Sequence, residues 1–470
     1  MGNIKNNKNG GQITGRTGLD GSGNYLPLDL GSPGHVLTID GSSNVIWATA
    51  SSSSTSGIWG IPDSTGTYTY YSTLTLAIAA AVSGQTIELF SDVTETSDVT
   101  IDLKNGVNIN LNGHTYKRTV AVATSSLFRD NGVAVGCSIK NGTLWNTSGG
   151  GSSFGLILTA ASIVDLSGTR IYVSGSGNTA IYLNNSSAEV YNAIVEVVPS
   201  VVCLYISSGK AYNIKAKGPH RICELVTSTS FVYNSDFTSS GGNISLYIGA
   251  GSAINCTSTN TGANSAVWLV GGTAIDCVAY SAGIGFLINS LSSSAINCIG
   301  YSSGNLGIQV GSTGANLIQG CKAYSAGSYG LDILGPVTIS ISNSTFYSSV
   351  AVAANSNPAS GTVRFENCTF DSLISQGVNI QASTDLYNCV VNSYYNNING
   401  HAVVFAGASN CIVTGCVFRV TNSSAYALHS SSAITEKYTS NTYIGSTTPV
   451  NPNITQGVSN TPDSQGNILI

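Results

Sequence analysis

Short runs of alternating apolar and polar positions recur along most of the chain. Each run reads small, apolar, variable, apolar, as in GLIL, AIYL, CLYI, SLYI, AVWL, GFLI, GIQV, GLDI and GVNI. Period-2 alternation predicts a β-strand whose apolar side chains point to one side, and no helical periodicity interrupts the runs. The expected inward pairs include Val267 and Leu269, Phe286 and Ile288, Ile308 and Val310, and Leu331 and Ile333.

A second column is set by the steps AINC, AIDC and AINC, whose cysteines Cys256, Cys277 and Cys298 are 21 residues apart. Equivalent steps follow at intervals of 23, 23, 24, 21 and 27 residues, and earlier ones precede them at intervals of 21. A period in the 20s is typical of a solenoid. We call the position of the cysteine in each step a mark. The further marks are Cys321, Ser344, Cys368, Cys389 and Cys416, then Ser235, Ile214 and Ala193, and more faintly Gly168, Gly142 and Gly113.

Both columns follow from stacked coils, and the Leu-rich consensus of leucine-rich repeats is absent. We therefore predict an all-β fold, a single-stranded parallel β-helix of roughly 14 coils, about 65 Å long at roughly 4.8 Å per coil. The cysteine column is expected to pack inside as a small apolar stack, with metal or redox chemistry as the weaker alternative. The residue before each mark suits a left-handed bend: Asn255, Asp276, Asn297, Gly320, Asn343, Asn367, Asn388 and Gly415.

The two ends of the repeat differ from its middle. Residues 58–445 are expected to form the β-helix, with a capping helix near 73–83 that begins after Ser72 or Thr73 and closes at Gly84. Residues 1–57 read as a Gly-, Asn- and Ser-rich segment with a hairpin turn at Asp40-Gly41 and a linker. Residues 446–470 read as an irregular tail in which NILI could pair at a sheet edge.

Composition narrows the function. Only 8% of residues are charged and the net charge is -5, so neither nucleic acid nor an anionic membrane surface is an expected partner. No apolar run is long enough to span a bilayer, and the first residues do not read as a signal peptide. The 11 cysteines are odd in number and include no CxxC pair, so we expect them reduced and buried, with no metal and no cofactor.

Two outward-facing rows carry the candidate contact residues. The variable position of successive strands gives the first row, and the position three after each mark gives the second. Stacked exposed aromatics need an explanation, and two remain open: contact with a neighbouring protomer, or stacking on the sugar rings of a surface glycan, with acidic members accepting hydroxyl hydrogen bonds. The first row contains Tyr182, Tyr205, Glu224, Tyr247, Trp268, Leu287, Gln309 and Asp332, and the second Tyr280, Tyr301, Tyr324 and Tyr347.

The densest charge cluster, KAYNIKAKGPHRICE, runs from Lys210 to Glu224. Its spacing places it on the turns of adjacent coils. It reads either as a solvated edge or as a contact for an anionic sugar.

The stretch GHVLTIDGSSNVIWATA contains Gly34, Val36, Leu37, Thr38, Asp40, Gly41 and Trp47. These positions resemble a short element near the N-termini of bacteriophage fibre and tail-spike proteins. The segment STLTLAIAAAVSGQTIELFSDVTET with the following coils is similar to the entry of pectate-lyase-like right-handed β-helices. The resemblance implies a homotrimer that is assembled in the host cytoplasm, attached to other virion proteins through residues 1–57, and exposed on the particle. Such spikes often end in a trimerisation domain, for which residues 446–470 are short.

The motifs of the related enzymes are missing: the acid cluster of pectate lyases, and the Asn-Thr-Asp, Asp-Asp and Gly-His-Gly motifs of polygalacturonases. No catalytic residue is assigned. The expected function is a structural virion fibre or spike for host-glycan adhesion or decoration. The alternative is a polysaccharide depolymerase on the same scaffold, with two carboxylates from distant coils. A bacterial adhesin and an ice-binding β-helix fit less well, because an export signal and Thr-x-Thr columns are missing.

Overall fold

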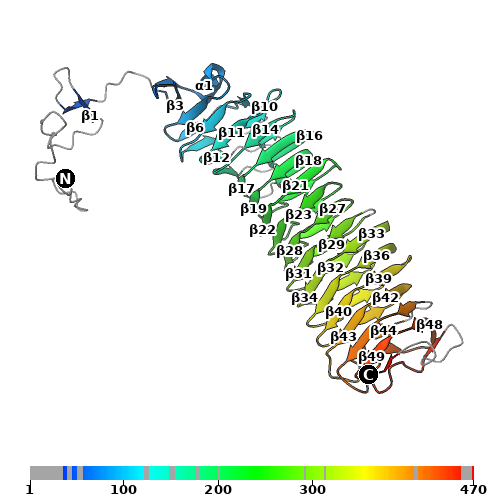
Figure 1. Ribbon diagram of the computed structural model, residues 1–470. Helices are drawn as coiled ribbons and strands as arrows, with labels where there is room; N and C mark the ends of the chain where they lie inside the picture. Colours follow the sequence, from blue (N-terminus) through cyan, green and yellow to red (C-terminus); the bar gives the residue numbers. More distant parts are fainter. Residues whose placement is uncertain are drawn as a thin grey trace, which may run out of the picture.

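The computed structural model describes residues 35–39, 45–49, 57–120, 126–147, 154–174, 179–198, 202–290, 293–311, 314–406, 411–456 and 468–469. From residue 57 onward the chain winds into an elongated shaft of about 14 turns. Each turn places one strand in each of three parallel ladders, here called ladders A, B and C (Figure 1). The predicted all-β parallel β-helix is therefore confirmed.

Ladder A contains the strands of the first column. They are β7 (Ile101–Leu103), β10 (Phe128–Asp130), β13 (Phe154–Leu158), the first parts of β16 (Thr179–Tyr191) and β18 (Val202–Tyr212), β20 (Cys223–Leu225), β23 (Leu246–Ile248), β26 (Val267–Leu269), β29 (Phe286–Ile288), β32 (Ile308–Val310), β35 (Leu331–Ile333), β38 (Ala354–Ser356), β41 (Val378–Ile380), β44 (Val403–Phe405) and β47 (Leu428–Ser430).

Ladder B follows ladder A in each turn. It contains β5 (Thr86–Leu89), β8 (Asn108–Asn110), β11 (Cys137–Lys140), β14 (Ile163–Asp165), the last parts of β16 and β18, β21 (Ser230–Tyr233), β24 (Ser252–Ile254), β27 (Thr273–Ile275), β30 (Ser294–Ile296), β33 (Gly314–Gln319), β36 (Val337–Ser342), β39 (Val363–Glu366), β42 (Thr384–Tyr387), β45 (Ile412–Thr414), β48 (Ile434–Thr439) and β50 (Ile454–Gln456).

Ladder C completes the turn. It contains β6 (Val93–Glu95), β9 (Thr115–Arg118), β12 (Gly142–Asn146), β15 (Thr169–Val173), β17 (Ile194–Val197), β19 (Lys215–Gly218), β22 (Asp236–Ser239), β25 (Thr257–Asn260), β28 (Val278–Ser281), β31 (Ile299–Ser302), β34 (Lys322–Ser325), β37 (Thr345–Ser348), β40 (Thr369–Ser372), β43 (Val390–Ser393), β46 (Val417–Val420), β49 (Thr442–Ile444) and β51 (Ile468–Leu469).

The corner between ladders B and C is a single residue in the left-handed conformation. Asn255, Asp276 and Asn297 have φ of 52°, 52° and 53°, as predicted from their place before each mark. The short polar side chains of Asn and Asp tolerate this conformation. Two faint marks are corrected: Gly168 and Gly113 have positive φ at this corner, and Thr169 is the residue that pairs with Gly142 in the column.

The cysteine column lies directly after this corner and is buried. All 11 cysteines are free and buried, as expected. Their thiols are also donors: Cys277 Sγ lies 3.2 Å from the carbonyl of Ile275, and Cys298 Sγ lies 3.3 Å from that of Ile296. The column therefore fills the interior and satisfies carbonyl groups beside the tight bend.

The N-terminal end of the shaft is covered by α1 (Leu74–Ala80) and by the hairpin of β3 (Trp59–Pro62) with β4 (Tyr68–Tyr71). The N-cap is Thr73, whose side chain accepts a hydrogen bond from the Leu76 N–H at 3.3 Å. Leu74, Ala77 and Ile78 are buried. Within the described residues no helix has the length and apolar character that a membrane crossing requires.

Two segments outside the main coils also form strands. β1 (His35–Ile39) and β2 (Val45–Thr49) pair antiparallel, in line with the hairpin predicted there, although the turn itself lies outside the described residues. The tail was expected to be irregular apart from NILI at a sheet edge: β51, which lies in NILI, pairs with β49, and β50 also pairs with β48. The shaft ladders therefore continue into residues 446–470.

Candidate functional site

The first predicted row lies on the outer face of ladder A in the expected register. Tyr182 pairs with Tyr205, which pairs with Glu224, and the row continues through Tyr247 and Trp268. These side chains are half-buried rather than exposed, because neighbouring coils cover them.

Most side chains of this row are already in contact with other side chains of the same chain. Tyr182 stacks on Phe154 with centroids 5.1 Å apart, and Trp268 meets Tyr247 edge to face at 5.7 Å. The Arg221 guanidinium lies 4.5 Å from the centre of the Tyr247 ring. It also forms a 2.8 Å ion pair with Oε2 of Glu224, so one oxygen of this predicted hydroxyl acceptor already has a partner within the chain.

Asp332, predicted as an outward acceptor, is 5% exposed, and this expectation is corrected. Burial raises the pKa of its carboxyl group, while the amide of Asn355 donates a hydrogen bond at 2.8 Å. Asn379 donates in turn to Asn355 at 2.9 Å. Asp332 thus belongs to a ladder of side chains that hydrogen-bond to one another between coils.

The second predicted row, on the outer face of ladder C, is a stack of rings. Tyr280 and Tyr301 lie 5.1 Å apart with 4° between their planes, Tyr301 and Tyr324 lie 4.9 Å apart with 10°, and Tyr347 is tilted by 50°. Parallel rings at this spacing cover each other's faces. The two end members have a ring on one side only: Tyr280, which is 45% exposed, has Thr259 on its other side, and Tyr347, which is half-buried, has Asp371.

Ladder B carries a similar stack, which is not part of either predicted row. Tyr191 and Tyr212 lie 4.6 Å apart with 5° between their planes, and Tyr212 and Tyr233 lie 4.8 Å apart with 8°. Each of these tyrosines directly precedes the corner asparagine, a position that could have been read as a column. Repetition of the device on two faces shows that tyrosine stacking is one way in which the coils hold together.

Followed toward the N-terminus, the ladder C row changes character. From Tyr280 it passes through Thr259, Thr238, Lys217 and Glu196 before it reaches Tyr172. Two aromatic residues therefore bracket four polar positions over five coil steps, about 24 Å at roughly 4.8 Å per step.

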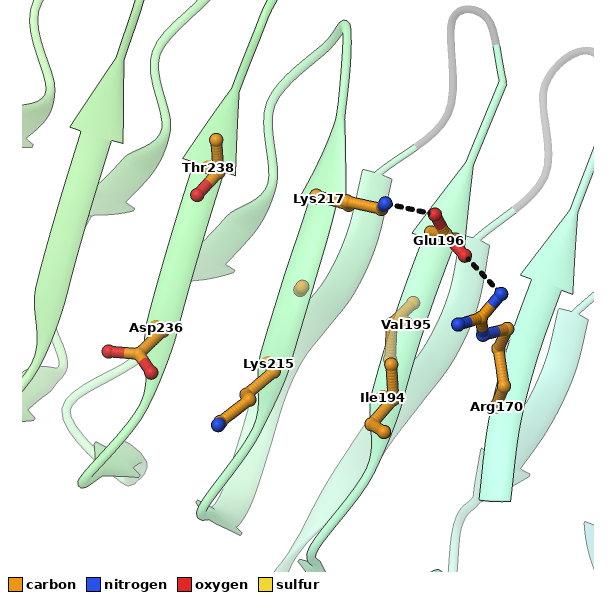
Figure 2. A pocket seen from close by; sticks show the side chains of 9 residues that line it. Arg170, Ile194, Val195, Glu196, Lys215, Lys217, Asp236 and Thr238 are labelled. Carbon is orange, nitrogen blue, oxygen red and sulfur yellow. Dashed lines mark ion pairs between the residues drawn. The ribbon is translucent and has the colours of Figure 1, made fainter. Parts of the chain in front are cut away.

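A hollow of about 320 Å³ opens within this bracket, over β15, β17, β19 and β22 (Figure 2). Val195 and Ala216 belong to its inner lining, and both are buried members of the core. Its outer lining consists of Arg170, Ile194, Glu196, Lys215, Lys217, Asp236 and Thr238.

One carboxylate organises the charged wall of the hollow. Glu196 Oε2 lies 3.2 Å from Arg170 Nη1, and Glu196 Oε1 pairs with Lys217 Nζ, so that three successive coils are bridged (Figure 2). The Glu196 side chain is 18% exposed, whereas Arg170 and Lys217 are 56% and 63% exposed. Both cations therefore keep N–H groups directed to solvent.

The charged residues of the Lys210–Glu224 stretch lie on three different faces of the shaft, those of ladders A, B and C. Lys210 pairs with Glu189 on ladder B at 3.0 Å, and Arg221 pairs with Glu224 beside ladder A. Of the charged residues in this stretch, Lys215 and Lys217 alone line the hollow. Of the remaining charged residues there, Glu196 could have been found by extending the second row backward, since it lies three residues after the mark Ala193.

The attachment-motif residues Val36 and Leu37 lie in β1 and Trp47 in β2, where Leu37 pairs with Trp47. Gly34, Asp40 and Gly41 fall outside the described residues. Across the described part of the chain no group of three or more His, Cys, Asp or Glu residues is arranged to hold a metal ion.

The described chain is thus a right-handed β-helix with a charged hollow on one flank, and comparison with known proteins agrees on the fold. A family model described as "Right handed beta helix region" matches residues 282–442. No curated protein matches the sequence.

Several solved structures are similar at low identity. A mutant tailspike protein of E. coli bacteriophage HK620, in complex with a hexasaccharide, is 14% identical with a TM-score of 0.41, over 87% of this chain and 83% of that one. The Azotobacter vinelandii mannuronan C-5 epimerase AlgE4 A-module is 12% identical with a TM-score of 0.28, over 82% and 94%. The periplasmic alginate epimerase AlgG is 9% identical with a TM-score of 0.31, over 67% and 76%. At this similarity no property is carried over from these proteins.

Proposed function

We propose that this protein is the shaft of a bacteriophage fibre or spike that binds a host-surface polysaccharide along the outer face of ladder C. The observation that carries the proposal is the hollow bracketed by Tyr172 and Tyr280. The row from Tyr172 to Tyr280 spans about 24 Å, with the hollow over its first coils, an aromatic residue at each end and hydrogen-bonding groups between. A row of this kind suits an elongated chain of sugar rings, which have apolar faces and hydroxyl edges.

Attachment to the virion is proposed for residues 1–57, with residues 58–445 as the shaft. The proposal is supported by the resemblance of the Gly34–Trp47 stretch to the N-terminal element of phage fibres. Imaging of virions in which this chain is labelled tests the location. Absence of the chain from purified virions would contradict the proposed attachment.

A homotrimer is proposed, supported by apolar side chains on three successive turns between ladders C and A. Exposed apolar groups in one place are typical of protein contacts. Analytical ultracentrifugation is expected to give three times the chain mass, and a monomer at micromolar concentration would contradict the trimer. The side chains are Val350, Leu373, Ile374, Tyr394 and Ile398, 41% to 62% exposed.

Adhesion is favoured over the depolymerase alternative. The hollow contains two carboxylates, on Glu196 and Asp236, and a glycosidase needs such a pair. Both oxygens of Glu196, however, are occupied by Arg170 and Lys217. Glu196 is therefore better placed to orient these cations than to donate or accept a proton in catalysis.

The test of adhesion is binding of purified host-surface polysaccharide, with a pair of matched variants. Tyr280→Ala removes the exposed ring face and is expected to weaken binding about three- to tenfold. Tyr324→Ala is the control, because neighbouring rings already cover Tyr324 on the same row. Equal loss in both variants, or no binding by the unmodified protein, would contradict the proposal.

A further inference from the structure

The hollow is a positively charged site on a protein whose net charge is negative. Three cations line it, Arg170, Lys215 and Lys217, against two carboxylates, Glu196 and Asp236, which leaves one net positive charge where the whole chain carries -5. Low overall charge makes such a local excess informative, because only 8% of residues are charged.

We propose that this hollow binds the anionic substituent of an acidic polysaccharide, a carboxylate, phosphate or sulfate group carried on a sugar ring. The inference rests on the proposed adhesion and names the class of glycan that is bound. It assigns the charged hollow to the substituent and the aromatic ends of the row to the neighbouring rings.

The geometry supports an anion at this place. Glu196 holds Arg170 and Lys217 on one wall, so their positions are set before a ligand arrives. Arg170 has five N–H groups and Lys217 has three, and Glu196 occupies one of each in the ion pairs described. The remaining donors can form charge-assisted hydrogen bonds, which are stronger than neutral ones.

Lys215 supplies the opposite side. It projects from the same strand as Lys217 (Figure 2). The small Ala216 separates the two lysines in the sequence. In the described part of the chain Lys215 has no carboxylate within ion-pair distance, although Asp236 is its cross-strand neighbour. An anion bound on this side of the hollow would give Lys215 an ion-pair partner.

The other lining residues favour a sugar over a free inorganic anion. Ile194 is 40% exposed and offers an apolar surface on β17, where the face of a ring can pack. The hydroxyl of Thr238 lies on the same wall as Lys217 and can pair with a ring hydroxyl. Asp236 lies at the far edge and opposes the bound negative charge.

The inference is tested with three probes: an oligogalacturonate, the same oligomer after reduction of its carboxyl groups, and a phosphate-bearing capsule fragment. Binding is measured by isothermal titration at two salt concentrations. At least one anionic probe is expected to bind, to weaken as salt rises, and to bind at least about tenfold more tightly than the reduced oligomer. The two anionic probes distinguish a carboxylate from a phosphate source.

Charge variants give the sign of the effect. Lys215→Ala and Lys217→Ala are each expected to weaken binding of the anionic probe about tenfold, and Asp236→Asn to strengthen it. Lys322→Ala is the matched control, since Lys322 is an exposed lysine on the same face of ladder C outside the hollow. Inorganic phosphate alone is expected to compete weakly, because it lacks the ring.

The outcomes separate the two proposals. If the reduced oligomer binds as tightly as the anionic probes, or if Lys322→Ala weakens binding as much as Lys215→Ala, the anionic assignment is wrong and adhesion stands. If neither these probes nor the host polysaccharide binds, adhesion itself is wrong.

Discussion

The corner asparagines show how one residue type serves both conformation and pairing. Asn255 has a φ of 52°, and its side-chain amide donates to Asn234 Oδ1 on the preceding coil at 2.8 Å. Where glycine replaces asparagine the preceding side chain fills the space: a Cβ on Gly320 would lie 2.3 Å from Asn297 Oδ1. The corner therefore needs a residue that tolerates positive φ, and the hydrogen bond is an additional gain.

Substitution of Asn255 separates these two contributions. Asn255→Gly keeps the conformation and loses the hydrogen bond, so the free energy of unfolding is expected to fall by about 1 kcal/mol. Asn255→Val also places a β-branched residue in the left-handed conformation, so the free energy of unfolding is expected to fall by about 2–3 kcal/mol in total. Urea unfolding followed by circular dichroism measures both, and equal losses would show that conformation does not matter here.

Among the elements, α1 shows how a solenoid end is closed. A helix of seven residues is too short to be stable alone. Its apolar side chains pack on the first coils, and Lys104 from the next coil donates to the carbonyls of Ile78, Ala79 and Ala81 at 3.3, 3.1 and 2.6 Å. A positive charge at the C-terminal end of a helix is also favourable to its dipole.

Loss of this cap is expected to act locally. Lys104→Met keeps the apolar stem but removes the donors, and should cost about 1–2 kcal/mol at the first coils. Hydrogen exchange of the amides in residues 74–81 is expected to accelerate, while coils farther along stay protected, because solenoid repeats contact only their neighbours. Lys140→Met, which breaks the exposed 3.1 Å ion pair with Asp165, is the control and should leave α1 unchanged.

At the level of the whole shaft, the C-terminal coils contain a feature that links stability to pH. His401 is 5% exposed, stacks on His429 with centroids 4.0 Å apart, and accepts a hydrogen bond from the Tyr426 N–H at 3.0 Å. Burial and the neighbouring His429 lower the pKa of His401 to about 4, and burial lowers the pKa of His429. Both imidazole rings are therefore neutral in the folded protein at neutral pH.

The sign of the pH dependence follows. Between about pH 6.5 and 4 the unfolded chain binds a proton at His401 that the folded chain does not, so stability is full above pH 6.5 and falls as the pH is lowered. The loss reaches up to about 3 kcal/mol. The difference between the unfolding midpoints at pH 7 and at pH 4.5 is expected to be smaller in His401→Gln than in the unmodified protein. Parallel pH profiles in the two proteins would contradict the assignment.

The fold could be predicted in detail because a solenoid turns a linear period into spatial columns. The spacing of Cys256, Cys277 and Cys298 places these residues one coil apart, and the alternation in each strand places their neighbours inside or outside. Each of these inferences is local, since it depends only on the adjacent coil. The errors are also local: Gly168 was one residue out of register, because a glycine at the corner looks like a small residue in the column.

The site could be predicted only in part. The rows of Tyr182 and Tyr280 are correctly aligned by the period, but the period says nothing about ring planes or partners. Stacking of Tyr301 on Tyr324, burial of Asp332 and pairing of Glu224 with Arg221 depend on side-chain rotamers, and these are set by packing between coils.

The repeat in the amino-acid order was enough to establish a stacked β-helix, its buried thiols and its left-handed corners, because these follow from backbone geometry and residue size. The hollow is different in kind. Arg170 comes from β15 and Lys217 from β19, 47 positions later, and Glu196 between them holds both. Its location depends on where long side chains extend between coils, which is a property of the assembled surface and not of any single period.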